Sequence, residues 1–343
     1  MHYDVIALIG RFEPFHNGHM SVVRRALETC DRMVILIGSA EAARSTRNPF
    51  SAAEREVMIR AALGADAARV VFRPIVDHLY NEGAWQADVQ QQVSEAVAST
   101  GIDPATARIG LIGHDKDASS WYLHAFPQWD LVEVPFATTL SATELREHLF
   151  ADDAGALRLV EANVPKAVFE TLQAFRTTKT FAQLAEEQRH IVAYKAAWAN
   201  APYPPTFLTV DAVIVHSGHI LLVRRGAQPG KGLWALPGGF VNQDETLLEA
   251  AIRELKEETR IKLPVPVLKG SLKGQKVFDE PDRSQRGRTV THAFHFEFAS
   301  GDLPAVRGSD DAARARWVPL AEVRRLREYL FEDHYFIIEH FTL

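Results

Sequence analysis

Six carboxylates crowd the stretch between residues 244 and 258 of this 343-residue chain. Apolar residues recur through it at helical spacing, which predicts one amphipathic helix from Thr246 to Thr259. On that helix Glu254, Glu257 and Glu258 share a face, because residues three and four apart are neighbours. Like charges so placed destabilise a bare helix, whereas a hard divalent cation such as Mg²⁺ favours carboxylate ligands. We therefore predict a metal site at these glutamates; the alternative is a solvated acidic helix.

The same stretch resembles the Nudix box, a pattern of glycine, glutamate, arginine and aliphatic residues at fixed spacing. The matching positions are Gly239, Glu245, Arg253, Glu254, Leu255, Glu257, Glu258 and Ile261. Arg260 stands where the family has a glycine that ends the helix in a left-handed turn, so the local turn is open to question. The resemblance implies Mg²⁺-dependent, or Mn²⁺-dependent, hydrolysis of a diphosphate. Glu254, Glu257 and Glu258 would be metal ligands and catalytic residues, and Gly239, Glu245 and Arg253 would support them.

Two polar segments in the first half could bind phosphate. GRFEPFHNGH follows an apolar run and places His16 and His19 at the start of a predicted helix. SATELR offers Ser141 and Thr143 at another helix start, with Arg146 about one turn on. Imidazoles, arginine and unpaired helix N–H groups bind anions, so the two segments together predict a site for nucleotide phosphates. Taken singly, either histidine could be a capping or core residue.

These segments resemble the G-x-F-x-P-x-H-x-G-H and S-x-T-x-x-R signatures of the nucleotidyltransferase superfamily. Asn81 to Trp85 (NEGAW) and Arg47 to Ser51 (RNPFS) are similar to the nicotinamide-ring site of archaeal-type nicotinamide mononucleotide (NMN) adenylyltransferases. The resemblance implies adenylyl transfer from ATP to NMN with Mg²⁺ bound, and Trp85 stacking on the pyridine ring. An ordinary core role for Trp85 is the alternative.

The same resemblance implies which residues act. His16, His19 and Arg146 would neutralise charge in the transition state. The substrate-binding set would comprise Gly10, Arg11, Phe12, Arg47, Asn81, Trp85, Gly113, Asp115, Ser141 and Thr143. For the segment from Gly113 to Asp117 an exposed charged loop is an equal alternative.

The elements that must position these residues alternate between strand and helix through the first half. Strands are predicted at Val5–Ile9, Met33–Ile37, Val70–Val76, Ile109–Ile112 and Leu131–Val134. Capping boxes at Ser51 and Ser141 open two of the helices. Alternation of this kind predicts a doubly wound parallel sheet, whose ligands bind at the carboxyl ends of the strands.

A helical connector over residues 177–205, ending in prolines, separates a nucleotidyltransferase domain (1–176) from a Nudix domain (206–343). In the second domain, a predicted hairpin turns at Ser217-Gly218, and strands on both sides of the box helix agree with the αβα sandwich of the Nudix family. Lys276–His292 is predicted as a long polar loop. There Arg283, Arg286 and Arg288 would bind a diphosphate or ribose and Phe278 a base, unless the loop is merely solvated.

Whole-chain composition limits the function. A net charge of −6 argues against general nucleic-acid binding, which needs a basic face. Cys30 is the only cysteine, so no internal disulfide can form, and no apolar run reaches the length of a membrane span. We expect a cytoplasmic protein; the oligomeric state, a homo-oligomer included, stays open.

Both halves together resemble bacterial bifunctional NMN adenylyltransferase/Nudix hydrolases, whose second half cleaves ADP-ribose to AMP and ribose 5-phosphate. ATP, NMN, NAD and ADP-ribose are the implied ligands. One alternative is an adenylyltransferase whose Nudix half only senses a nucleotide. The other is a non-enzymatic transcription regulator of NAD metabolism, which the nearly intact box and the absence of a basic DNA-binding helix disfavour.

Overall fold

The computed structural model describes residues 2–114, 118–134, 140–151 and 153–342. The chain divides into two compact units, Met1–Ala185 and Glu186–Leu343. The division falls inside helix α7 (Lys179–Ala197), within the range 177–205 that the sequence predicts as a connector. Leu184 and Ala185, near the start of this helix, pack in the core of the first unit. In the described part of the chain, no helix is long and apolar enough to cross a membrane.

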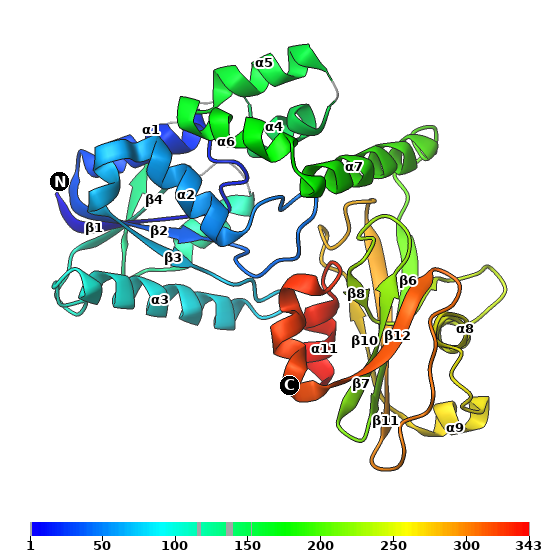
Figure 1. Cartoon of the computed structure of the whole chain (residues 1–343). Helices are drawn as coiled ribbons and strands as arrows, with labels where there is room; N and C mark the ends of the chain where they lie inside the picture. The colour runs from blue at the N-terminus through cyan, green and yellow to red at the C-terminus, as the bar shows by residue number, and fades with distance from the viewer. Residues whose placement is uncertain (1, 115–117, 135–139, 152, 343) are drawn as a thin grey trace. The chain divides into compact units, whose positions relative to one another are not determined.

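The first unit is built on a five-stranded parallel sheet of order β3-β2-β1-β4-β5 (Figure 1). Its strands are β1 (Tyr3–Gly10), β2 (Cys30–Ile37), β3 (Val70–Pro74), β4 (Ile109–Gly113) and β5 (Asp130–Glu133). All five predicted strands are therefore present. The chain extends to one side of β1 and then returns to its other side, so a crevice opens at the carboxyl ends of β1 and β4.

Helices cover both faces of this sheet. Along β1, Ile6 and Leu8 enter one core and Val5 and Ala7 enter the other, because successive strand residues point to opposite faces. The first core includes residues of α1 (Asn17–Leu27), α2 (Ala52–Leu63), α4 (Ala142–Phe150), α5 (Ala154–Asn163) and α6 (Lys166–Arg176). The second core includes α3 (Glu82–Ser99); two short 3₁₀ helices are η1 (Gly64–Arg69) and η2 (Ala118–His124). The predicted doubly wound α/β fold is confirmed.

The second unit contains a mixed sheet of order β10-β11-β6-β7-β12, with β8 beside β7 and β9 beside β6. The strands are β6 (Phe207–His216), β7 (His219–Arg225), β8 (Trp234–Ala235), β9 (Gly238–Phe240), β10 (Leu272–Phe278), β11 (Thr289–Phe298) and β12 (Ala312–Pro319). β6 and β11 run parallel, and the other pairs are antiparallel. The predicted hairpin turns at Ser217 and Gly218, whose φ angles of 48° and 71° suit a two-residue turn.

Helices also cover both faces of the second sheet (Figure 1). The apolar side of α8 (Leu247–Thr259) packs in one core with Phe294 and Phe296 of β11. Between these two residues His295 points to the opposite face, where it contacts Phe341 of α11 (His334–Thr342) at 5.3 Å between ring centroids. The remaining elements are α9 (Val265–Gly270), α10 (Leu320–Val323) and the 3₁₀ helix η3 (Arg324–Tyr329). This arrangement confirms the predicted αβα sandwich.

The polar segment 276–292 is a loop only in its middle part, which shortens the loop that the sequence predicts. β10 continues to Phe278 and β11 begins at Thr289, so only residues 279–288 connect them. Exposed and partly buried residues alternate along β10, with Lys276 at a partly buried position and Val277 at an exposed one. The charged side chain of Lys276 on the more buried side obscured the alternation that marks a strand.

Candidate active sites

His16 and His19 lie together at the start of α1, with their ring centroids 3.7 Å apart. His16 is the N-cap residue, and its Nδ1 accepts a hydrogen bond from the Gly18 N–H at 3.1 Å. His19 Nδ1 accepts one from the His16 N–H at 3.2 Å. Because both Nδ1 atoms accept, the proton of each neutral ring is assigned to Nε2. The helix start therefore holds two imidazole N–H donors, as a phosphate site requires.

Three arginines from separate segments, two loops and helix α4, lie close to the segment that carries these histidines. Arg146 is buried, donates from Nη1 to the Glu13 carbonyl at 2.7 Å and from Nη2 to Thr143 Oγ1 at 3.1 Å. The pKa of Arg146 is lowered to about 10, chiefly by burial; the positive charges of Arg11 and Arg47 contribute to the lowering, and Glu13 opposes it. The three guanidinium groups thus act on one another electrostatically, which favours binding of a highly charged anion between them.

The other residues predicted for this site serve mainly as local supports. Ser141 caps α4: its Oγ accepts from the Glu144 N–H and donates to Glu144 Oε2, so the predicted capping box is present, as is the one at Ser51. Asn81 caps α3, accepting from the Ala84 N–H at 3.1 Å. Glycine is required at position 10, where a Cβ atom would stand 2.8 Å from the buried ring of Phe12.

Gly113 ends β4 and packs against Leu123. A Cβ atom at position 113 would stand 2.7 Å from the Leu123 side chain, so there is little room for a larger residue. Asp115, with Lys116 and Asp117, lies outside the described residues. Of the predicted set, the structure thus brings His16, His19, Arg11, Arg47 and Arg146 together, and it places Phe12 with its side chain in the core. Phe12 can meet a ligand only through its backbone.

Trp85 lies on the first turn of α3 and is partly buried. Its ring contacts Trp121 at 5.4 Å, Phe126 at 5.9 Å and Tyr122 at 6.5 Å between centroids. It packs against the second core of the unit and keeps part of its surface exposed. Both predicted roles, a wall for a pyridine ring and a core aromatic, are compatible with this position.

Arg253 is the centre of the carboxylate cluster in the second unit. It donates from Nε and Nη2 to the two oxygens of Glu245 at 2.9 and 2.6 Å. Its Nη1 reaches Glu254 Oε1 at 2.8 Å and Glu257 Oε2 at 2.9 Å. The hydrogen bonds from Arg253 lower the pKa of Glu245 to about 2. The predicted pairing of Arg253 with the carboxylates of the box is therefore present.

Glu254 and Glu258 lie against the two glycines before the helix. Glu258 is buried, accepts a hydrogen bond from the Gly238 N–H at 3.0 Å, and has its pKa raised to about 8 chiefly by burial. A Cβ atom at Gly239 would stand 2.5 Å from Glu254 Oε1, so only glycine lets the carboxylate approach this backbone. Burial also raises the pKa of Glu254. Two desolvated carboxyl groups side by side favour a cation.

These carboxylates fit a divalent cation by their chemistry. Mg²⁺ and Mn²⁺ prefer carboxylate oxygens, and three such side chains share one face of α8. Within the described part of the chain, no three His, Cys, Asp or Glu side chains are already arranged as a metal-binding group. Arg253 Nη1 hydrogen-bonds to both Glu254 and Glu257.

Arg260 takes over the role of the missing box glycine. It adopts the left-handed conformation, with φ 52° and ψ 24°, and its N–H bonds to the Lys256 carbonyl. Its Nε donates to Ser309 Oγ at 2.8 Å. The helix thus ends in the turn typical of the box although the residue is not glycine.

The predicted substrate contacts of the segment 276–292 divide into two groups. Phe278 is fully buried against His340 and Phe341, and the side chain of Arg283 is 2% exposed and binds both oxygens of Asp333. Neither has a surface for a ligand here, which argues against their predicted contacts. Arg286 lies over the exposed ring of Phe240 at 5.4 Å and keeps 14% of its side chain exposed, 4.0 Å from Glu332. Arg288 bonds to Asp279 and is 38% exposed, so neither arginine is fully buried.

Sequence reasoning missed several buried polar residues that support the two sites. Asp211 accepts from Thr291 Oγ1 at 2.6 Å and lies 4.0 Å from His334 Nε2, behind Gly238. Glu13 and Arg55 form a buried ion pair in the first unit. The sequence does indicate that Arg55 is buried, because it is three and four residues from Met58 and Ile59 and so shares the apolar face of α2 with them. A charge at such a position needs buried partners.

Comparison with known proteins matches both units. A family model described as cytidylyltransferase-like matches residues 7–147, and one described as NUDIX domain matches residues 205–341. The chain is 35% identical over 189 residues to a nicotinamide/nicotinic acid mononucleotide adenylyltransferase of Acinetobacter baylyi, covering 54% of this chain and 94% of that protein. It is 39% identical over 130 residues to an ADP-ribose pyrophosphatase of Methanocaldococcus jannaschii, covering 37% of this chain and 72% of that one.

A solved structure resembles the whole chain. The bifunctional NMN adenylyltransferase/ADP ribose pyrophosphatase of Francisella tularensis, in complex with AMP and a manganese ion, superposes with a TM-score of 0.88. The two sequences are 35% identical, and the match covers 98% of each chain.

Proposed function

The chain belongs to the family of bifunctional NMN adenylyltransferases/ADP-ribose pyrophosphatases, and we propose that it performs both reactions. The first unit transfers the adenylyl group of ATP to NMN and forms NAD and pyrophosphate. The second unit hydrolyses ADP-ribose to AMP and ribose 5-phosphate. The observation that carries this proposal is that each unit contains its own phosphate-handling side chains: cationic in the first, carboxylate in the second.

In the first reaction the 5′-phosphate of NMN attacks the α-phosphorus of ATP, and pyrophosphate leaves without a covalent enzyme intermediate. Arg11, Arg47 and Arg146 bind the polyphosphate, since their charges already act on one another. His16 and His19 donate from Nε2 to phosphate oxygens as negative charge develops. The chemistry demands only positioning and charge neutralisation, which fixed donors supply without reorganisation.

NMN recognition is assigned to Trp85. Its ring is partly exposed on the first turn of α3, at the end of the loop that follows β3. A cationic pyridinium ring is attracted to an aromatic face, with indole the strongest of the aromatic side chains. The contacts of Trp85 with Trp121 and Phe126 fix its orientation, so little side-chain entropy is lost on binding.

In the second reaction water attacks the diphosphate of ADP-ribose. Glu254, Glu257 and Glu258 would hold Mg²⁺ or Mn²⁺, which neutralises the diphosphate and activates water. Arg253 orients Glu254 and Glu257 through its Nη1 hydrogen bonds. Arg286, over the ring of Phe240, and the more exposed Arg288 remain the candidates for contact with the substrate's diphosphate. Among the three glutamates the general base stays open. A divalent cation in the first site is likewise part of the proposal.

Two assays of the purified chain test the proposal, one with NMN and ATP and one with ADP-ribose, each with Mg²⁺. We expect NAD in the first and AMP in the second. NAD without AMP would favour a Nudix half that only senses a nucleotide. The absence of both products would favour the non-enzymatic regulator.

A further inference from the structure

Glu13 and Arg55 form a charged pair that is almost completely removed from solvent. Each side chain is 1% exposed, and Arg55 Nε lies 3.2 Å from Glu13 Oε1. Glu13 belongs to the loop after β1, and Arg55 to the first turn of α2. Burying charge is costly unless it is paired and fully hydrogen-bonded, so such a pair needs a reason beyond general stability.

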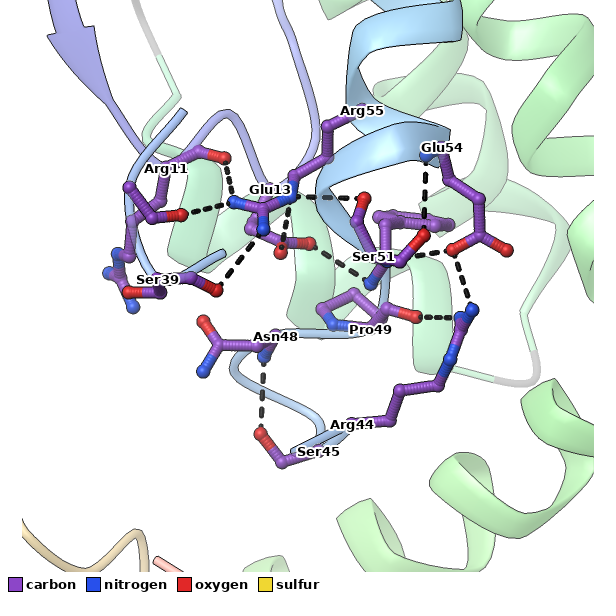
Figure 2. A network of polar contacts seen from close by, with 12 residues as sticks. Arg11, Glu13, Ser39, Arg44, Ser45, Asn48, Pro49, Ser51, Glu54 and Arg55 are labelled. Carbon is purple, nitrogen blue, oxygen red and sulfur yellow. Dashed lines mark hydrogen bonds and ion pairs between the residues drawn. The ribbon is translucent and has the colours of Figure 1, made fainter. Parts of the chain in front are cut away.

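The guanidinium of Arg55 bonds to carbonyls from three parts of the crevice (Figure 2). Its Nη1 donates to the Arg11 carbonyl at 2.7 Å and to the Gly38 carbonyl at 2.6 Å. Its Nη2 donates to the Ser39 carbonyl at 3.2 Å, and its Nε to the Ser51 carbonyl at 3.3 Å. One side chain thus connects the loop after β1, the loop after β2 and the cap of α2.

Glu13 makes a complementary set of contacts. Its Oε2 accepts from the Phe50 N–H at 3.2 Å, at the far end of the loop after β2. Its backbone carbonyl accepts from Arg146 Nη1 at 2.7 Å, which brings α4 to the same point. The loop from Gly38 to Ser51 is therefore held at both ends by this pair, and Arg47 lies within it.

An outer ion pair supports the same loop from the solvent side. Arg44 Nη2 lies 2.8 Å from Glu54 Oε2, and Arg44 Nη1 donates to the Pro49 carbonyl at 2.8 Å (Figure 2). These side chains are 38% and 44% exposed, so water screens their charges, and pairs of this kind contribute little. The buried Glu13–Arg55 pair therefore contributes more than the Arg44–Glu54 pair to holding the loop from Gly38 to Ser51 in place.

We propose that Glu13 and Arg55 form a buried clasp that sets the spacing between Arg11 and Arg47 and so aligns the phosphates for transfer. Both are positioning residues, because their contacts are with backbone groups of the loops. The inference rests on the proposed adenylyl transfer. Reacting groups must be held close to their productive geometry, and a displacement of about 1 Å can lower the rate ~100-fold.

Arg55→Lys is the decisive variant. Lysine keeps the positive charge beside Glu13 but has one nitrogen in place of the planar fork, so it cannot reach the carbonyls of Arg11, Gly38 and Ser39 together. We expect kcat for NAD synthesis to fall ~10-fold or more, with the KM and the calorimetric Kd for NMN changed by less than about threefold. Cooperative thermal unfolding at the wild-type temperature reports that the chain is folded, and NMN binding reports that the site at Trp85, outside the clasp, is intact.

The matched control is Arg60→Lys, the same change on the solvent side of the same helix, where Arg60 pairs with Glu56 and lies over Phe72. It should leave kcat unchanged. A second variant, Glu13→Gln with Arg55→Gln, removes both charges and so leaves no uncompensated buried charge. It should keep NMN binding and lose kcat like Arg55→Lys.

Three results would overturn the clasp: kcat of Arg55→Lys within twofold of wild type, an equal loss in Arg60→Lys, or loss of NMN binding in parallel with kcat in both clasp variants. The last would mean that the pair only stabilises the fold. A wild-type chain that forms no NAD would instead overturn the proposed function itself.

Discussion

In the first unit the phosphate-handling side chains come from loops and helix starts that are far apart in sequence, whereas in the second unit they come from one helix. Arg146 and Glu13, which touch, are 133 residues apart. Glu254, Glu257 and Glu258 are three and four residues apart on α8, and their supporting Arg253 lies on the same helix. The second site, carried by one helix, depends on contacts between residues close in sequence. The first site, at the edge of a sheet, depends on buried hydrogen bonds between distant segments.

The charges of the two sites differ in the same way. The first site gathers positively charged side chains for the phosphates of the substrate. Burial and these neighbouring charges lower the pKa of Arg146. The second collects carboxyl groups, and burial raises the pKa of Glu258. Each desolvated set calls for a counter-charge of opposite sign: polyphosphate in one, a divalent cation in the other. The predictions below separate these two dependences.

Glu258→Gln should have the largest effect, and only on the second reaction. Glutamine has similar helix propensity and can still accept from the Gly238 N–H, but it removes one ligand charge. We expect kcat for ADP-ribose hydrolysis to fall ~10³-fold, since metal-assisted charge stabilisation amounts to several kcal/mol. NAD synthesis should stay near wild type. If both activities vanished in a variant that still melts cooperatively, the sites could not be independent.

His19→Ala should act in the opposite direction. Loss of one donor to the transition state lowers kcat for NAD synthesis by ~10²-fold or more, with ADP-ribose hydrolysis unchanged. His19 also accepts from the His16 N–H, so His19→Gln, which retains an acceptor for that bond, is the matched control for the helix start. Turnover that stays at the wild-type level in the alanine variant would remove His19 from the mechanism.

Trp85→Ala tests whether the first site also binds the pyridine ring of NMN by aromatic stacking. We expect the KM for NMN to rise more than that for ATP, by an amount equivalent to about 0.5–2 kcal/mol. Because Trp85 also contacts Trp121 and Phe126, Trp85→Phe provides the comparison that keeps most of the packing. Equal changes in the two KM values would identify a core tryptophan.

Arg260→Gly should have the smallest effect. Left-handed backbone costs a non-glycine residue about 1–2 kcal/mol, which glycine recovers. The gain is offset by the greater freedom of glycine in the unfolded chain, about 0.4–1 kcal/mol, and by the lost bond to Ser309. Urea denaturation should therefore show a change in unfolding free energy of less than about 1 kcal/mol. A strong destabilisation would mean that the Ser309 contact, not the turn, holds the end of α8.

Much of this protein was predictable from short stretches of its sequence. Short apolar runs located the five strands of the first sheet, helical spacing located the box helix, and capping residues marked the helix starts at Ser51 and Ser141. These features depend on residues within about one or two turns of one another, so periodicity and cap chemistry suffice to identify them. The resemblance to the Nudix box also implied that Arg253 supports the glutamates.

Only the tertiary structure decided which polar residues face a ligand. The sequence predicts Arg283 as a substrate contact, but in the structure it is buried and pairs with Asp333, 50 residues away. Phe278, predicted to contact a base, is part of the core. Arg55 joins carbonyls 17 and 44 residues away, and no pattern of the sequence names those partners. A side chain's exposure depends on what packs over it from distant segments, and local periodicity carries no record of that packing.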